Sequence, residues 1–189
     1  MDDMTTRRPG PRVIRYLLPM VAIAALLLTV SAVSARQGGT TLADVRAATA
    51  RYHDIEVAKA DGYGIFYMCT DNETPGVGAM GQHYVKGALV GDPAIDALRP
   101  EALMYAPKPG GGWRLVGMEY VVIKADWDAA FSGRTPTVLG LPLKVVAAGN
   151  RYGLPEFYQR HVWLWRNNPS GMFEDWNPSV SCRGTGDPA

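Results

Sequence analysis

The first 35 residues have the composition of an export signal, and this decides which part of the chain has to fold. Residues 1–15 carry four arginines, residues 16–30 are apolar apart from Thr29, and small residues lead to Ala35. A positive region, an apolar region and small residues before the cleavage point are typical of a secretory signal peptide. The apolar run is near the lower length limit for crossing a bilayer and contains Pro19. We therefore predict cleavage after Ala35, with a retained membrane anchor as the alternative.

The chain that remains, residues 36–189, has the size of one domain and almost no net charge. Removing four arginines and two aspartates changes the formal net charge of the 189-residue chain from +1 to −1. A domain without excess positive charge has no electrostatic attraction to nucleic acid or to anionic lipid. We expect a single domain that is secreted, or located in the periplasm or cell envelope. A membrane is a partner only if the N-terminal segment is retained.

Two cysteines, Cys69 and Cys182, are present, and both lie in the part that would be exported. In an oxidising compartment an even number of cysteines is typical of disulfide pairing. We therefore predict a Cys69–Cys182 disulfide that closes a long loop. Two metal-binding thiolates or two free thiols are the alternatives.

The pattern of apolar residues predicts an α+β domain, in which an N-terminal helix is followed by a curled antiparallel sheet. Residues 41–60 have helical periodicity, with Thr41 and Asp44 in the positions of a capping box. Short strand patterns and glycine-rich turns follow. The sequence lacks the alternation of strands and helices that would predict a parallel sheet. A hairpin is predicted across the loop 107–112, and the tail is expected to be an ordered loop held by Cys182. The expected strands cover residues 63–69, 83–85, 103–106, 113–125, 138–148 (interrupted at Gly140 and Pro142) and 156–165, with a short helix over residues 126–130.

Two common catalytic motifs are absent from the sequence. The glycine-rich segment 75–81 lacks the Gly-Lys-Ser/Thr ending of a phosphate-binding loop, and no Gly-x-Ser-x-Gly nucleophile motif occurs. The glycines of this segment are better explained by a close approach of the backbone to another element.

Glu119 is the most informative polar residue, because it lies within a strand pattern that is apolar on both faces. Residues 115–123 read Leu-Val-Gly-Met-Glu-Tyr-Val-Val-Ile, which is typical of a central, covered strand. A carboxylate buried there needs a cation, a metal ion or donated hydrogen bonds, or it takes up a proton. A structural ion pair with an arginine is an equally good interpretation.

His83 and His161 are also placed on or beside predicted strands, and a curled sheet could bring them to Glu119. Two imidazoles and one carboxylate are suited to Zn²⁺, Fe²⁺ or Mn²⁺ and leave positions open for a ligand. We predict a metal or small-ligand site formed by these three residues, with Tyr84, Tyr120 and Trp163 nearby. No catalytic residue is assigned, and a purely structural or hydrogen-bonding role of the three residues is the alternative.

The aromatic residues suggest two further interpretations of the function. Five tryptophans and nine tyrosines could stack on a sugar ring or on an apolar ligand, as in a non-catalytic binding module for a small molecule or glycan. A structural protein of the cell envelope, whose buried polar residues only define the fold, is the third possibility.

Several segments together are similar to a family of small secreted bacterial proteins without an assigned activity. Among them are Glu119-Tyr120, the His-x-Trp-x-Trp run that begins at His161, and Trp176-Asn177-Pro178. The resemblance covers most of the chain after the signal peptide. It implies an exported single domain, but no reaction. The matching segments are residues 52–63, 78–85, 99–103, 116–120, 161–165 and 168–182.

Overall fold

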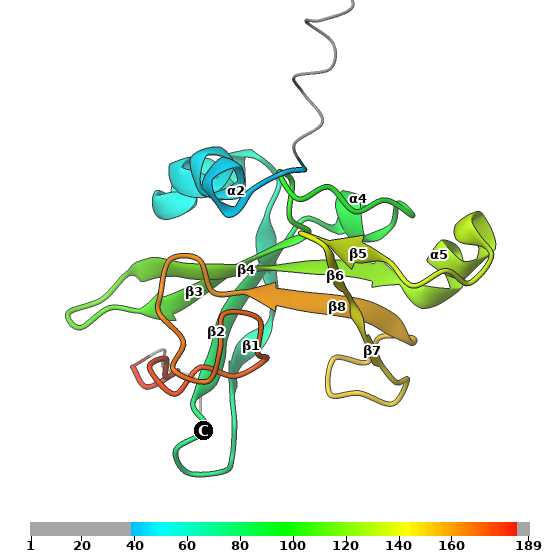
Figure 1. Ribbon diagram of the computed structural model, residues 1–189. Coiled ribbons are helices and arrows are strands. Elements are labelled where there is room, and N and C mark those ends of the chain that lie inside the picture. Colours follow the sequence, from blue (N-terminus) through cyan, green and yellow to red (C-terminus); the bar gives the residue numbers. More distant parts are fainter. Residues whose placement is uncertain (1–38, 185–189) are drawn as a thin grey trace, which may run out of the picture. The chain divides into compact units, whose positions relative to one another are not determined.

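A computed structural model describes residues 39–184 (Figure 1). The predicted signal peptide, residues 1–35, lies outside the described residues. Within the described part of the chain, no helix is long and apolar enough to cross a membrane. The described residues form an α+β structure around a curled antiparallel sheet, as the sequence predicts at this level.

The main sheet has six strands in the order β1-β2-β3-β4-β8-β7, and every neighbouring pair is antiparallel. Strand β4 is the longest and lies between β3 and β8, in the interior of the sheet. A two-stranded hairpin of β5 and β6 lies outside it. The strands are β1 (Gly64–Asp71), β2 (Ala79–Val85), β3 (Ala102–Pro107), β4 (Trp113–Ile123), β5 (Thr137–Val138), β6 (Leu141–Pro142), β7 (Lys144–Val146) and β8 (Phe157–Val162).

The helix predicted over residues 41–60 is present, but in three segments. The expected capping box of Thr41 and Asp44 starts the first segment. Asp54 then interrupts the helix because its backbone is extended, and its side chain accepts a hydrogen bond from the Glu56 amide and begins a new helix. The helical segments are α2 (Leu42–Thr49), the 3-10 helix η2 (Ala50–His53), α3 (Ile55–Ala60), α4 (Gly87–Val90) and α5 (Lys124–Phe131).

Apolar residues of α2 and α3 cover one face of the sheet (Figure 1). Val45 of α2 packs in one cluster with β4 residues that include Tyr120. Ala58 of α3 packs in a second cluster with Tyr84 of β2 and Tyr105 of β3. Since neighbouring residues of a strand point to opposite faces, the other face carries His83 and Glu119.

The C-terminal segment, residues 167–182, crosses the face of the sheet that carries His83. Its Asn177 exchanges two backbone hydrogen bonds of 3.2 Å with Ala79 at the start of β2. The predicted disulfide between Cys69 and Cys182 is confirmed, with a Cα–Cα distance of 5.7 Å, and it fixes the end of this segment to β1.

The glycines before His83 allow close approach of the backbone, as predicted. Gly78 has φ +84°, and a Cβ atom there would lie 2.0 Å from the Asn177 carbonyl oxygen. Gly81 has φ +91°, and its Cβ would lie 2.5 Å from the carbonyl oxygen of Tyr105. Both positions therefore require glycine, for its positive φ and for the missing side chain.

The strand-like region predicted over residues 138–148, with interruptions at Gly140 and Pro142, is divided among β5, β6 and β7. Leu139 and Gly140 both have positive φ and form the two-residue turn between β5 and β6. The chain then continues into β7, which pairs with β8 at the edge of the main sheet.

Candidate metal centre

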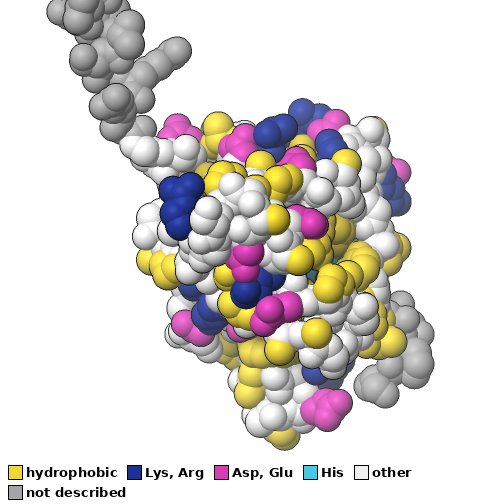
Figure 2. All heavy atoms as spheres, turned by 90° about the vertical axis from the view of Figure 1, so that its right-hand side faces the viewer, with side chains coloured by type: hydrophobic (Ala, Val, Ile, Leu, Met, Phe, Trp, Pro, Cys, Tyr) yellow, Lys and Arg dark blue, Asp and Glu magenta, His cyan; other side chains and the backbone are white. Residues whose placement is uncertain are grey.

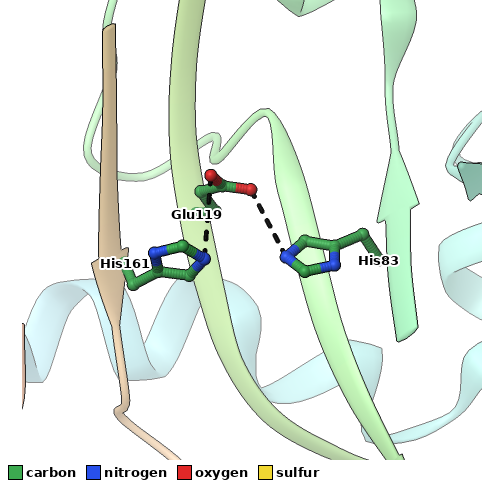
Figure 3. Close-up of side chains that lie close together, drawn as sticks. All are labelled: His83, Glu119 and His161. Carbon is green, nitrogen blue, oxygen red and sulfur yellow. Dashed lines mark ion pairs between the residues drawn. The ribbon is translucent and has the colours of Figure 1, made fainter. Parts of the chain in front are cut away.

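His83, Glu119 and His161 come from three different strands and converge on one point (Figure 3). His83 lies on β2, Glu119 on β4 and His161 on β8. The Glu119 carboxyl group lies between the two imidazole rings. Its Oε2 is 3.4 Å from His83 Nε2, and its Oε1 is 3.7 Å from His161 Nε2. Each residue offers one ligand atom, and these atoms lie within 4.8 Å of one another.

The register of the strands explains this convergence. Glu119 and His161 are paired directly across β4 and β8. His83 is two strands away from Glu119, because β3 lies between β2 and β4. On β3, Ala102 is paired with Glu119 and Met104 with His83, so the two site residues are offset by two positions along the sheet and their side chains reach each other diagonally across β3.

Burial controls the charges of the three site residues. His83 and Glu119 are 5% and 7% exposed. Burial, with a smaller contribution from His161, lowers the pKa of His83 to about 3. Burial also raises the pKa of Glu119, and the opposing effect of His161 is smaller. His83 is thus a neutral imidazole, the form that binds a metal ion.

His161 is completely buried, and neither of its ring nitrogens has a hydrogen-bond partner among residues 39–184. The nearest polar atoms are carboxylate oxygens, of Glu119 near Nε2 and of Asp175 at 3.5 Å from Nδ1. The ring stacks on Trp163 with a centroid distance of 6.4 Å and an interplanar angle of 14°. A buried imidazole whose nitrogens make no hydrogen bond is costly unless another group satisfies them.

Asp175 lies in the position of an outer carboxylate behind His161. Burial acts to raise the pKa of Asp175, but His161 and Lys144 outweigh it and lower this pKa. The Lys144 ammonium is 3.5 Å from the same carboxylate oxygen. An ionised carboxylate behind a histidine is the usual arrangement that orients a metal-binding imidazole.

The spacing of the three ligand atoms is close to that of a metal centre. Ligand atoms bound tetrahedrally to zinc at about 2.0–2.1 Å lie about 3.3 Å from one another. His83 Nε2 lies 3.4 Å from one Glu119 oxygen, which is already this length, and His161 Nε2 lies 3.7 Å from the other oxygen. One ligand atom from each residue lies within 4.8 Å of the other two, so rotations of the side chains would have to shorten the longer separations around a bound ion. The residues present therefore fit a divalent metal ion.

A cavity of about 300 Å³ adjoins this cluster, and His83 and Glu119 form part of its wall. Tyr152, from the loop between β7 and β8, also lines it. The remaining side chains of its lining are apolar, namely Phe66, Val85, Val90, Val121, Leu154 and Phe157. A molecule in the cavity would thus contact two of the three candidate ligands.

The aromatic residues predicted near the site are divided between the two faces of the sheet. Trp163 lies beside His161, on the same face of the sheet. Tyr84 and Tyr120 belong to the helix-covered face, because each directly follows a site residue along its strand. The Tyr120 hydroxyl donates a hydrogen bond to the Ala97 carbonyl, and neither tyrosine lines the cavity.

Asp175 and Tyr152 were missed at the level of sequence. Both lie in loops, where the sequence has no helical or strand periodicity. Folding brings Asp175 to His161 and Tyr152 to the cavity. Glu101 was missed as well. It is a second buried carboxyl group, and it accepts a hydrogen bond from the Val121 amide.

Charged side chains of both signs are interspersed on the surface that Figure 2 shows, in agreement with the small net charge. Comparison of the chain with protein-family models, with curated proteins and with solved structures finds no match.

Proposed function

We propose that this chain is an exported protein that binds a divalent transition metal ion through His83, Glu119 and His161. The observation that carries the proposal is the environment of His161. Its ring is fully buried, both nitrogens lack hydrogen bonds, and Nε2 faces the Glu119 carboxyl group. A cation shared with His83 and Glu119 would satisfy all three side chains at once.

The ligand set favours Zn²⁺, Fe²⁺ or Mn²⁺. Two imidazole nitrogens and one carboxylate are three ligands, so the metal would keep at least one position open. Asp175 supports this assignment because it stands behind His161 in the outer position. A metal ion bound in this way would supply Lewis acidity or activate a water molecule. The chain's own residues would hold the ion and exclude bulk water on the side of His161.

An extracytoplasmic location is supported by the Cys69–Cys182 disulfide, which is typical of oxidising compartments. A protein that folds there meets the metal ions of the periplasm or the cell exterior. The predicted signal peptide over residues 1–35 agrees with this proposal.

The proposal is tested by metal analysis of full-length protein purified without a histidine tag, followed by calorimetric titration of the metal-free protein with Zn²⁺, Mn²⁺ and Fe²⁺. We expect one ion per chain for at least one of these metals. Glu119→Gln should weaken binding at least tenfold, because it replaces the only anionic ligand. The matched control is Glu101→Gln, which changes another buried carboxyl group that is not among the three ligands and should leave metal binding unchanged.

A second pair of variants tests the role of the Asp175 carboxylate behind His161 in the same titration. Asp175→Asn should weaken metal binding by roughly 10–100-fold, the range typical of outer-shell carboxylates. Glu174→Gln is the control. Glu174 is the neighbouring residue and forms an ion pair with the same Lys144, but it is Asp175 whose carboxylate pairs with His161.

A folded wild-type protein that binds none of the three metals, and whose melting temperature they do not raise, would contradict the proposal. That result would favour a non-catalytic binding module or a structural protein of the cell envelope.

A further inference from the structure

The cavity beside the candidate metal centre has the volume of a small-molecule site. Its 300 Å³ is at the lower end of the usual range for ligand pockets. An apolar protein cavity of about 150 Å³ holds benzene, so this cavity has room for a molecule about twice that size. His83 and Glu119 are the only ionisable groups in its wall besides the Tyr152 phenol.

The aromatic side of the cavity is built by an irregularity in β1. The pairing of β1 with β2 is regular up to Phe66 and resumes at Thr70, and Tyr67 between them has φ +61°. The side chain of Gln82 holds this bulge, because its Nε2 donates a hydrogen bond of 2.9 Å to the Tyr67 carbonyl. Bulges and positive φ at bulky residues are found preferentially next to functional sites.

As a result, two consecutive residues of β1 contact the same ring. Phe66 and Tyr67 lie 6.3 and 5.4 Å from Tyr152, measured between ring centroids. Tyr152 in turn lies 6.4 Å from Phe157. Phe66, Tyr152 and Phe157 line the cavity, whereas Tyr67 supports Tyr152 from outside its wall. The three lining rings are suited to the face or edge of a flat, apolar molecule.

The charge of the site limits how many negatively charged groups such a molecule can carry. A divalent ion together with the Glu119 carboxylate has a net charge of +1, and no lysine or arginine lines the cavity. One anionic oxygen on the open metal position would neutralise this charge, whereas a second anionic group would be buried without a partner.

We infer that the cavity binds a compact aromatic molecule of one or two rings that carries a single ionisable oxygen, with the oxygen on the metal and the rings against Phe66 and Tyr152. This inference rests on the proposed metal centre and adds the chemical class of its ligand. Phenol-type compounds belong to this class. Sugars do not, because the cavity wall offers few hydrogen-bond partners. Dianionic compounds do not, because their second negative charge would be buried without a partner.

The test uses full-length protein, zinc, 2-naphthol and naphthalene. Zinc binding is first measured by calorimetry, and the affinity of each aromatic probe is then measured with and without bound zinc. We expect 2-naphthol to bind the zinc-loaded protein at least tenfold more tightly than the zinc-free protein. Naphthalene, which has no donor oxygen, should bind both forms equally.

A filling variant locates the binding. Val90→Trp places a large side chain in the cavity from α4, away from the metal ligands, and should reduce 2-naphthol affinity at least tenfold with zinc binding retained. Val145→Trp is the matched control, because Val145 lies on β7, is 49% exposed and is not part of the cavity wall. If Val90→Trp does not fold, Gly87→Leu serves instead, since no heavy atom lies within 4 Å of a Cβ at Gly87.

Two negative outcomes are distinguishable. If zinc binds but 2-naphthol has the same affinity for both forms, or is unaffected by the filling variants, the inference is overturned and the metal centre stands. If zinc itself does not bind, the proposed function and this inference both fail.

Discussion

Glu101 and Glu119 are two buried carboxyl groups with different surroundings. Glu119 faces two imidazoles that can share a cation with it. Within residues 39–184, Glu101 forms no ion pair with a lysine or arginine at contact distance, and its Oε2 accepts one hydrogen bond from the Val121 amide. Burial therefore dominates at Glu101 and raises its pKa to about 8. The neutral acid is the form that the folded protein stabilises there.

The raised pKa of Glu101 predicts a stability that falls as the pH rises. Below its ordinary pKa of 4.5 the carboxyl group is protonated in both the folded and the unfolded chain. Between about 4.5 and 8 the unfolded chain loses this proton while the folded chain retains it, so the free energy of unfolding decreases. Each unit by which the two pKa values differ corresponds to about 1.4 kcal/mol.

Urea unfolding of the wild type and of Glu101→Gln at several pH values between 5 and 8 measures this effect. The free energy of unfolding of the wild type should fall by a few kcal/mol relative to that of the variant, because Gln keeps the shape of the neutral acid and does not ionise. Parallel curves for the two proteins over this range would show that Glu101 is not the titrating group.

The position of Glu119 in a strand that is apolar on both faces was sufficient to predict its burial. The grouping of His83 and His161 with Glu119 was also predicted, but only as a hypothesis that a curled sheet brings the three residues together. Their convergence depends on the order β2-β3-β4-β8, and no local pattern specifies strand order.

At the scale of single elements, β2 depends on Gly81 for its approach to β3. Gly81→Ala should destabilise the protein by several kcal/mol, because Cβ would lie 2.5 Å from the Tyr105 carbonyl oxygen in addition to the strain of φ +91°. Gly110→Ala is the matched control, since Gly110 has φ +84° but no heavy atom within 4 Å of its Cβ. It should cost about 1 kcal/mol.

Thermal and urea unfolding of both variants give the comparison. Equal losses of stability in the two variants would mean that backbone strain alone, and not the contact with Tyr105, makes glycine necessary at position 81.

Local signals predicted some elements better than others. The hairpin of β3 and β4 follows from its glycine-rich loop over residues 107–112, and the structure contains it. The break at Asp54 was not predicted, because an aspartate on a helix surface and an aspartate at a helix start look alike in one sequence. An interruption at Gly140 was predicted, but a hairpin turn between β5 and β6 was not, because Leu139 adopts the positive φ that glycine or asparagine usually provides.

At the scale of the whole molecule, the Cys69–Cys182 disulfide joins the ends of a segment of the chain that contains most of the sheet, with a sequence separation of 113. On the entropic model, closing a loop of about this length stabilises the folded state by about 4–5 kcal/mol. Reduction should lower the free energy of unfolding by up to this amount. Urea unfolding with and without a reducing agent measures it, and a Cys69→Ala variant should show no response to the reducing agent.

The thiol content gives an independent check of the pairing. Denatured, unreduced protein should contain no titratable thiol, and two titratable thiols would contradict the disulfide.

The three candidate ligands lie on strands that are far apart in the sequence, and no two of them are close neighbours along the chain. An unfolded or partly synthesised chain therefore presents only single, weak ligands, and a selective centre exists once β2, β4 and β8 are assembled. If the chain crosses the membrane unfolded, the ion is acquired after translocation. Because binding strength alone favours copper and zinc over manganese and iron, the supply of ions at the place of folding would then decide which metal the protein carries.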